Sequence, residues 1–347
     1  MLEERYYNSD VIGIKKLIID CDPGIDDALA IILAVKSQQL QIDAITTVAG
    51  NTSLQNASEN VLRILSLLES ETIAVYQGSE KPLEKELLMA SEVHGRDGLA
   101  NTELAINPQI TYQDEPAVDF LISHILNHPN EITIIALGPL TNIASCILQE
   151  PTFSSKVKEL IIMGGAIFEP GNISRTAEFN FFIDPDAAKI VLDSGIKTIT
   201  LVPLDVTHKV IFTPELLETI NQEKAIEPQT LLEFVYNLIK FYHKFYIGVC
   251  DFPGCPLHDP LAVTVAIDPS LVKKQKMDVK IATTSESFSR ENNQLYNPEY
   301  ELVRGQTIAE LRPGVAQKNA VPNVNVCVDV DSQKVLDFFI KTITKRI

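Results

Sequence analysis

Short apolar runs alternate along the chain with longer segments in which apolar residues recur every three or four positions. The short runs are rich in β-branched side chains, which is typical of strands buried on both faces. The predicted strands cover residues 16–20, 44–48, 132–137, 160–163 and 198–202. The longer segments have the spacing of amphipathic helices. The predicted helices cover residues 25–36, 54–68, 140–148, 185–192, 231–246, 261–267 and 332–345.

This alternation predicts an α/β fold with an open, mostly parallel, Rossmann-like sheet and helices on both faces. Two stretches break the alternation. Residues 78–116 form a long charged connection, and loops of that length are usually functional or mobile. Residues 276–330 look strand-like without helices, which predicts a small antiparallel appendage to the sheet near the C-terminus. No Gly-, Ser- or Pro-rich linker marks a boundary, so residues 1–347 are predicted to form a single domain.

Composition narrows the class of protein. Hydrophobic residues make up 45% and charged residues 22%, which excludes a disordered or fibrous chain. The longest apolar run, residues 28–35, is too short to span a membrane, so no membrane partner is expected. The acidic start of the chain is not followed by an apolar segment, so we expect no secretory signal. Five cysteines without a C-x-x-C pair favour a reduced, cytoplasmic location.

The net charge of −17 comes from 29 basic and 46 acidic residues. Such a surface repels phosphate backbones, so a nucleic-acid partner is not expected. The sequence also lacks the glycine-rich nucleotide motifs, the G-x-S-x-G elbow of serine hydrolases, and a Cys/His set spaced for zinc. The acidic excess instead suits a protein that gathers carboxylates around a cation.

Four aspartates fall within eight residues where the first predicted strand meets the first helix: Asp20, Asp22, Asp26 and Asp27. In open α/β sheets, ligands bind beyond the carboxyl ends of the strands. The helix dipole explains one or two such residues, but two carboxylates ~4 Å apart repel by about 4 kcal/mol at an effective dielectric of about 20. The cluster therefore predicts a metal or an acid–base site. An EF-hand is excluded because Ile31 stands where that loop requires a glutamate.

Two further motifs carry candidate chemistry. His258 and Asp259 precede an apolar helix, where Asp259 could act as an N-cap and His258 could be an ordinary loop histidine. Glu178 and Asn180 follow a Gly-Gly pair. Two residues apart in an extended segment, they would point to one side and could hold vicinal hydroxyls. As a solvated strand face, the same pair would be unremarkable.

Other signals are weaker alone. Asn51 and Asn142 each follow a predicted strand, although Asn142 could simply cap a helix. Tyr242 and Tyr246 are four apart on an amphipathic helix and share a face, where tyrosines more often pack at the edge of a core. His94 lies between glycines in the long connection, and the simple alternative is a polar surface loop.

Taken together, these motifs resemble those of a known family. They occur in the same order as in that family, and they extend over nearly the whole chain. The motifs are Asp20-x-Asp22-Pro-Gly-x-Asp26-Asp27, Val48-Ala-Gly-Asn51, Met163-Gly-Gly, Glu178-Phe-Asn180 with Asp184-Pro, and Cys255-Pro-Leu-His258-Asp259. They look like the inosine–uridine-preferring nucleoside hydrolases. The resemblance implies an open α/β fold, a bound Ca²⁺, and hydrolysis of the N-glycosidic bond of purine or pyrimidine ribonucleosides to free base and ribose. It also implies a homodimer or homotetramer and a role in nucleoside salvage or catabolism.

The resemblance assigns Ca²⁺ to the carboxylates of Asp22, Asp27 and Asp259 and to the backbone carbonyl of Leu137. Leu137 departs from the Thr or Val often found there, which matters little for a main-chain ligand. Hard oxygen ligands without thiolate or imidazole select Ca²⁺ or Mg²⁺. Asp22 is in addition the implied general base that deprotonates the attacking water.

The remaining implied roles concern the nucleoside. Carboxylates around the ribose would stabilise an oxocarbenium-like transition state. His258 would protonate the departing base, because an imidazole titrates near neutral pH. Tyr242 and Tyr246 would lie near the base, and His94 would belong to a loop that closes on the substrate. The implied ribose contacts are Asp26, Asn51, Asn172, Glu178 and Asn180, with Met163 beside the ring.

Two alternatives belong to other classes. A phosphatase with an aspartate nucleophile also places Asp-x-Asp after a first strand. Against it, Pro23-Gly24 follows Asp22 directly, and a carboxylate-rich pocket repels phosphoesters. A nucleoside- or Ca²⁺-binding protein with a decayed site predicts a missing base or metal ligand, and none is missing.

Overall fold

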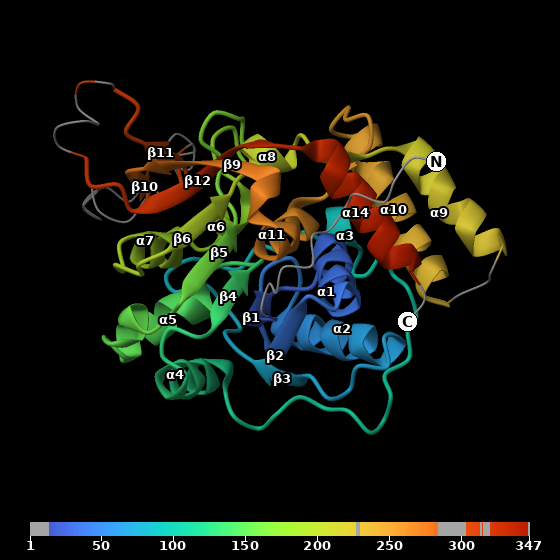
Figure 1. The fold of residues 1–347 in the computed structure, drawn as a ribbon, viewed down its shortest axis with the longest axis horizontal. Helices are drawn as coiled ribbons and strands as arrows, with labels where there is room; N and C mark the ends of the chain where they lie inside the picture. The colour runs from blue at the N-terminus through green and yellow to red at the C-terminus, as the bar shows by residue number, and fades with distance from the viewer. Residues whose placement is uncertain (1–13, 227–229, 284–302, 313, 315–319, 346–347) are drawn as a thin grey trace, which may run out of the picture.

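The computed structural model describes residues 14–226, 230–283, 303–312, 314 and 320–345 (Figure 1). The strands are β1 (Lys15–Cys21), β2 (Leu40–Thr47), β3 (Ala74–Gln77), β4 (Thr133–Ala136), β5 (Glu159–Met163), β6 (Ile199–Val202), β7 (Ile211–Phe212), β8 (Cys255–Pro256), β9 (Val272–Met277), β10 (Val279–Ile281), β11 (Thr307–Ala309) and β12 (Val324–Val330). The helices are α1 (Ile25–Ser37), α2 (Leu54–Leu67), α3 (Ser91–His94), α4 (Ala117–Asn127), α5 (Thr141–Gln149), α6 (Phe179–Ile183), α7 (Pro185–Leu192), α8 (Leu204–Thr207), α9 (Pro214–Ile226), α10 (Thr230–Gly248), α11 (His258–Ile267) and α14 (Ser332–Thr344), with short 3₁₀ turns at Phe153–Ser155 and Pro269–Leu271.

The main sheet has eight strands in the order β3-β2-β1-β4-β5-β6-β12-β9. Every neighbouring pair is parallel except β12 with β9. This confirms the predicted open, mostly parallel α/β sheet. The strand order reverses between β1 and β4, and a reversal of this kind opens a crevice beyond the carboxyl ends of the two strands.

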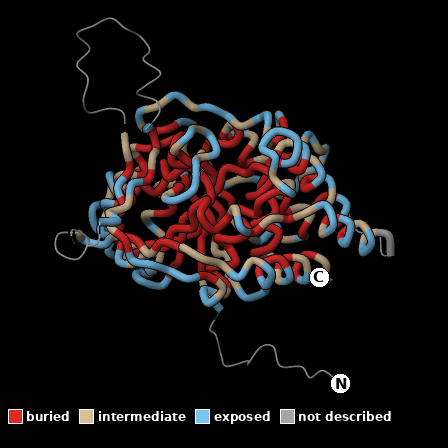
Figure 2. The backbone as a smooth tube through the Cα atoms, turned by 90° about the horizontal axis from the view of Figure 1, so that it is seen from above, coloured by how far each residue is buried: buried red, intermediate tan, exposed pale blue. Residues whose placement is uncertain are grey.

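Alternate side chains of the strands build two cores. On β1, Leu17 and Ile19 pack into the core shared with α1, α2, α10, α11 and α14. Ile18 points the other way, into the core shared with α4, α5 and α7. Both faces are covered because side chains alternate across a strand and every predicted strand is apolar at successive positions. The helices flank the sheet in Figure 1, and the buried residues fill the interior in Figure 2.

The predicted antiparallel appendage is present in part as an extension of the main sheet. The strand β9 pairs antiparallel with β12, while β10 and β11 form a separate two-stranded antiparallel sheet. Other parts of the predicted strand-like stretch, residues 284–302 and 315–319, lie outside the described residues.

The long connection between β3 and α4 runs across the carboxyl end of the sheet. The backbone N–H of Ala90 donates to the carbonyl of Asn51, and the N–H of Leu83 donates to Asp184 at 2.9 Å. This places α3 over the crevice at β1. No helix among the described residues is long and apolar enough to cross a membrane. All five cysteines, which lie in described parts of the chain, are free thiols.

Candidate active site

The aspartate cluster lies at the crevice, where α1 and α11 begin side by side. Ligand oxygens of Asp26, Asp27 and Asp259 all lie within 4.8 Å of one another. Asp26 and Asp27 are in the first turn of α1, and Asp259 is in the first turn of α11. The positive ends of both helix dipoles therefore face these carboxylates. Asp259 is not the N-cap, because α11 begins one residue earlier, at His258.

Asp27 and Asp22 hold the turn between β1 and α1. The Asp27 carboxylate accepts hydrogen bonds from the N–H groups of Gly24 at 2.9 Å and Asp22 at 3.2 Å, so it caps its own helix. Asp22 Oδ2 accepts from the Asn51 N–H at 2.6 Å. A Cβ on Gly50 or Gly138 would collide with the Asp22 carboxylate, so both positions must be glycine for it to fit.

These carboxylates fit a cation. Burial, together with neighbouring carboxylates, raises the pKa values of Asp22 and Asp259 well above the ordinary value of an aspartate. The same causes raise the pKa of Asp26 to about 8. Among the described residues, Asp22 Oδ1 and Asp26 Oδ1 are buried without a hydrogen-bond partner. Buried acceptors normally find partners, and a divalent cation would satisfy both oxygens and offset the repulsion. The ligands are all oxygens, which suits Ca²⁺ or Mg²⁺.

The predicted metal ligands are all near this point, but the tightest trio differs. Asp27 and Asp259 are together as predicted, and Asp26 completes the trio rather than Asp22. The Leu137 carbonyl, directly after β4, accepts from Asn180 Nδ2 at 2.6 Å. Asp20 lies apart, bound to Thr46 Oγ1 at 2.6 Å and Asn142 Nδ2 at 2.8 Å, so Asn142 does not cap its helix.

The prediction of an extended segment around Glu178 and Asn180 was wrong. Glu178 is the N-cap of α6, and Asn180 is inside that helix. The Glu178 carboxylate accepts from the N–H groups of Asn180 at 2.8 Å and Phe181 at 3.2 Å, which caps the helix, and from that of Gly165 at 2.9 Å. Asn180 Nδ2 reaches the carbonyl of Met163 at 3.3 Å as well as that of Leu137. Burial raises the pKa of Glu178 to about 7.

On the other side, Tyr246, His258 and Thr207 form a hydrogen-bonded row. Tyr242 packs against Tyr246 edge to face, with the ring centres 4.8 Å apart. Tyr246 Oη lies 2.8 Å from His258 Nε2, and His258 Nδ1 lies 2.8 Å from Thr207 Oγ1. His258 is buried, which lowers its pKa well below the ordinary value. It is therefore neither charged at neutral pH nor an ordinary loop histidine.

His94 closes the crevice from the long connection. Its Nδ1 accepts from the Ile25 N–H at 3.0 Å, which is the first N–H of α1. Its ring lies 5.6 Å from that of Tyr242. Only 5% of its surface is exposed, and burial lowers its pKa to about 3. A polar surface loop, the simple alternative, does not describe this residue.

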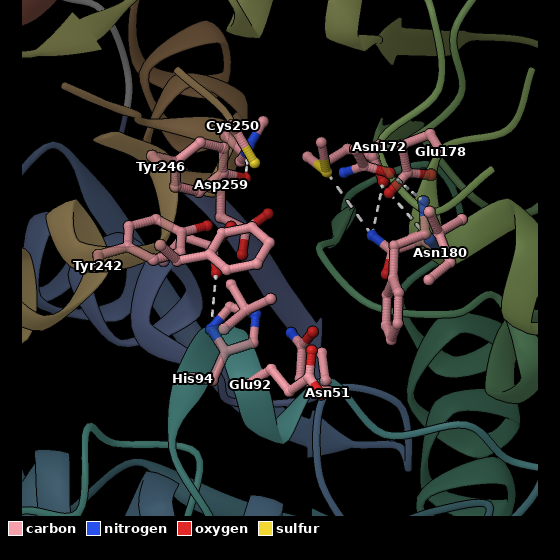
Figure 3. Close-up of a pocket in the computed structure, with 18 of the residues that line it drawn as sticks. Asn51, Glu92, His94, Asn172, Glu178, Asn180, Tyr242, Tyr246, Cys250 and Asp259 are labelled. Atoms are coloured by element: carbon pink, nitrogen blue, oxygen red, sulfur yellow. Dashed lines mark hydrogen bonds and ion pairs between the residues drawn. The ribbon is translucent and has the colours of Figure 1, made fainter. Parts of the chain in front are cut away.

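These groups enclose a cavity of about 380 Å³. Figure 3 shows Tyr242 and Tyr246 on one side, with Glu178 and Asn180 opposite. Asp22 and Asp27 are buried and do not line the cavity. The predicted residues that line it are Asp26, Asn51, His94, Leu137, Met163, Asn172, Glu178, Asn180, Tyr242, Tyr246, His258 and Asp259.

Sequence reasoning missed several residues of the site. Thr207 bonds His258, and His208 lines the cavity, where burial lowers its pKa to about 4. Both follow β6, so the rule that ligands bind beyond strand ends could have found them. Phe245 and Phe252 also line the cavity, but an aromatic residue in an amphipathic helix or a loop carries no such signal.

Comparison with known proteins decides the family. The model of the inosine-uridine preferring nucleoside hydrolases matches residues 17–337. The chain belongs to the inosine-uridine preferring nucleoside hydrolase family. A probable uridine nucleosidase 1 of Oryza sativa is 38% identical over 277 residues, covering 80% of this chain and 84% of that one. The inosine-uridine preferring nucleoside hydrolase of Crithidia fasciculata is 33% identical over 299 residues, covering 86% and 88%.

A solved plant nucleoside hydrolase superposes with a TM-score of 0.85 at 34% identity, covering 96% of this chain and 100% of that one. The chain is thus a nucleoside hydrolase, an enzyme that hydrolyses the N-glycosidic bond of ribonucleosides. This confirms the predicted reaction over the phosphatase and the decayed binding protein.

Proposed function

We propose that this nucleoside hydrolase is Ca²⁺-dependent and releases both purine and pyrimidine bases. The observation that carries the proposal is the pairing, around one cavity, of an acidic cluster with unpartnered oxygens and a row of proton-donating side chains. The first can hold a cation and a water molecule beside the ribose, and the second can protonate the leaving base.

Asp22, Asp27, Asp259 and the Leu137 carbonyl would hold the ion, with Asp26 beside them. Bound there, Ca²⁺ would lower the pKa of a water molecule and orient it. Asp22 accepts the proton of the attacking water, and its unpartnered Oδ1 is the atom placed for this. Its second oxygen stays bound to the Asn51 N–H, which fixes the orientation of the carboxylate.

The ribose lies between Asn51 and the opposite pair of Glu178 and Asn180. Asp26 and Asn172 supply further hydrogen-bonding groups, and Met163 lies beside the ring. As the bond to the base breaks, positive charge develops on the ribose. Preorganised carboxylates stabilise that charge in a site that excludes water.

The hydrogen-bonded row sets the direction of proton transfer. Tyr246 lines the cavity, so its O–H can donate to the base. The Tyr246 oxygen accepts from His258 Nε2–H, and the Thr207 oxygen accepts from Nδ1–H when the ring is charged. His258 is neutral at rest, so it takes up a proton before the bond to the base breaks. The charged ring then donates from Nε2 to Tyr246, Tyr246 passes its own hydroxyl proton to the base, and His258 returns to the neutral form.

The base side of the cavity favours planar rings of either size. Phe245, Phe252 and the two tyrosines supply aromatic surface there. The relatives point the same way: the Oryza protein is named for uridine, and the Crithidia enzyme for inosine and uridine. From the family resemblance we also propose a homodimer or homotetramer, located in the cytoplasm and acting in nucleoside salvage or catabolism.

The test measures base release from inosine, uridine, cytidine, adenosine and guanosine. The enzyme is dialysed against a chelator and assayed without metal, with CaCl₂ and with MgCl₂. We expect turnover of both purine and pyrimidine nucleosides, lost on dialysis and restored by Ca²⁺. Full activity in the metal-free enzyme would overturn the cation, and turnover of one base class alone would overturn the broad specificity.

A further inference from the structure

The helix α6, which carries Asn180 and begins at Glu178, cannot be stable by itself. It has five residues, and isolated helices shorter than about 12–15 residues are marginal in water. Its N-terminal N–H groups are satisfied by Glu178. Its last carbonyls, those of Phe182 and Ile183, need partners from elsewhere in the chain.

Arg304 supplies those partners from more than a hundred residues away. Its Nε donates to the Phe182 carbonyl at 2.8 Å, and an Nη donates to the Ile183 carbonyl at 3.3 Å. The guanidinium lies 4.3 Å from the centre of the Phe182 ring. The residue is 7% exposed. A cation at a helix C-terminus also complements the dipole, so Arg304 fixes the end of α6 in position and in orientation.

Two neighbours of Arg304 hold the same region. Gly305 has φ of +73°, and a Cβ there would lie 2.6 Å from the Phe181 carbonyl oxygen, so the chain can approach α6 this closely only with glycine. Thr307 Oγ1 accepts from the Ala166 N–H at 3.3 Å, in the turn that follows Met163. Arg304, Gly305 and Thr307 together are called the brace below.

We propose that Arg304 and Thr307 are positioning residues for ribose recognition. Neither lines the cavity, yet the brace contacts both pieces of its ribose side, α6 and the turn after β5. Reacting groups must be held to within about 0.5 Å, and a misplacement of about 1 Å can cost ~10²-fold in rate. The brace transmits the position of the C-terminal segment to Glu178 and Asn180. This inference rests on the proposed role of those two residues in holding ribose hydroxyls.

The experiment compares wild type with Arg304→Met and Thr307→Val. Each is assayed on uridine, on 2′-, 3′- and 5′-deoxyuridine, and on p-nitrophenyl riboside. We expect kcat/KM to fall about 10–100-fold for Arg304→Met, by the same factor on uridine and on p-nitrophenyl riboside, because both share the ribose. Thr307→Val should lose less. Arg304→Lys keeps the positive charge but lacks the planar guanidinium with its several N–H donors, so it should recover part of the lost kcat/KM.

The deoxy substrates separate positioning from stability. In wild type, removing a hydroxyl that α6 holds lowers kcat/KM. In Arg304→Met that penalty should shrink for at least one hydroxyl and persist for another, as expected for coupled groups. Arg312→Met is the matched control, since Arg312 is exposed in the same segment and pairs with Glu310. It should leave every ratio unchanged.

A merely structural brace predicts a lower melting temperature with wild-type ratios among the deoxy substrates, and that result would overturn the proposal. If Arg304→Met does not fold, Thr307→Val and Arg304→Lys carry the same comparison. A wild-type enzyme with normal turnover but no penalty for any deoxyuridine would instead refute ribose recognition by Glu178 and Asn180, which is the proposed function.

Discussion

His258 lies between two hydroxyl groups, and each can carry a proton to or from its ring. We expect His258→Ala to cripple inosine hydrolysis, by the ~10²–10⁴-fold typical of one acid–base group, and largely to spare p-nitrophenyl riboside. The reason is that p-nitrophenolate leaves without a proton, and a general acid stabilises only charge that develops on the departing atom. Steady-state kinetics on both substrates, with one enzyme preparation, measure the ratio.

Tyr246→Phe tests the path of that proton. It removes the hydroxyl 2.8 Å from His258 Nε2 and keeps the ring. It should reproduce the substrate dependence of His258→Ala. Equal losses of kcat/KM on both substrates in His258→Ala would assign His258 to binding or to the placement of Asp259. A lower melting temperature of that variant with unchanged kinetics would mean that His258 has only a structural role.

Asp22→Asn keeps the shape of the side chain and removes its negative charge and its proton acceptor. Since the carboxylate is wedged between two glycines, the variant should fold. We expect kcat for uridine to fall by at least ~10²-fold, because both the base and one cation ligand are weakened. Turnover near the wild-type value, measured in saturating CaCl₂, would show that another residue accepts the proton.

Functional residues could be recognised from the sequence only where several charged or polar side chains lie close together in it. Four aspartates in eight residues have no simple structural explanation, and the structure does gather two of them, Asp26 and Asp27, into one cluster with Asp259. Thr207 and Arg304 gave no such signal, because each bonds residues far along the chain. Such pairs depend on which strands neighbour each other, which no local pattern records.

At the scale of elements, the N-terminus of α1 depends on a loop. Gly24 has no side chain to cap the helix, and the Ile25 N–H donates instead to His94 Nδ1. His94→Ala should lower the free energy of unfolding by about 1 kcal/mol, the typical value of an N-cap. Denaturant titrations measure this, with His128→Ala as a control in a histidine remote from the cavity.

The same histidine gives a pH signature. Its pKa is about 3 when folded, against an ordinary value of 6.5, so between these values the unfolded chain binds the extra proton. The stability from neutral His94 is complete above pH 6.5 and is lost as the pH falls towards 3, at up to about 1.4 kcal/mol per pH unit. The difference in free energy of unfolding between wild type and His94→Ala should therefore shrink on acidification and reverse sign within about one pH unit below 6.5, where the loss exceeds the ~1 kcal/mol of the cap. A difference independent of pH would contradict the assignment.

Most elements with a full hydrophobic period were predicted, although the helix α4 was not, and the shortest elements, such as α6, were missed. The strands and helices of the sheet core appear close to their predicted bounds. The helix α6 was mistaken for extended chain because five residues contain little more than one helical turn. Its helical form comes from Glu178 and Arg304 at its two ends, and only the second of these is distant in sequence.

For the stability of the whole molecule, the positions of the charged groups matter more than the net charge. The chain carries −17, and part of that charge is buried at the crevice, where the turn after β1 and the first turns of α1 and α11 bring carboxylates together. Without a cation, the folded protein relieves this by holding protons. Burial and then Asp27 raise the pKa of Asp26 from 3.8 to about 8, so the folded state binds more protons than the unfolded chain between these values.

The sign of the consequence follows from linkage. In metal-free protein, the contribution of Asp26 to stability is greatest at low pH and is lost as the pH rises towards 8, because the unfolded chain releases its proton far more readily. A bound cation replaces that proton and favours the ionised form. Stabilisation by Ca²⁺ should therefore grow with pH, since metal and protons compete for the same oxygens.

We expect the rise in melting temperature on adding CaCl₂ to metal-free enzyme to be larger at pH 7.5 than at pH 5.5, by several degrees. The measurement is thermal unfolding at constant ionic strength, with NaCl in place of CaCl₂ as the blank. Asp329→Asn, at an exposed ion pair far from the crevice, should keep the full pH dependence, whereas Asp26→Asn should lose much of it. An increase that is equal at every pH would mean that these carboxylates are already ionised in the metal-free fold, and that the cation is not what permits their close approach.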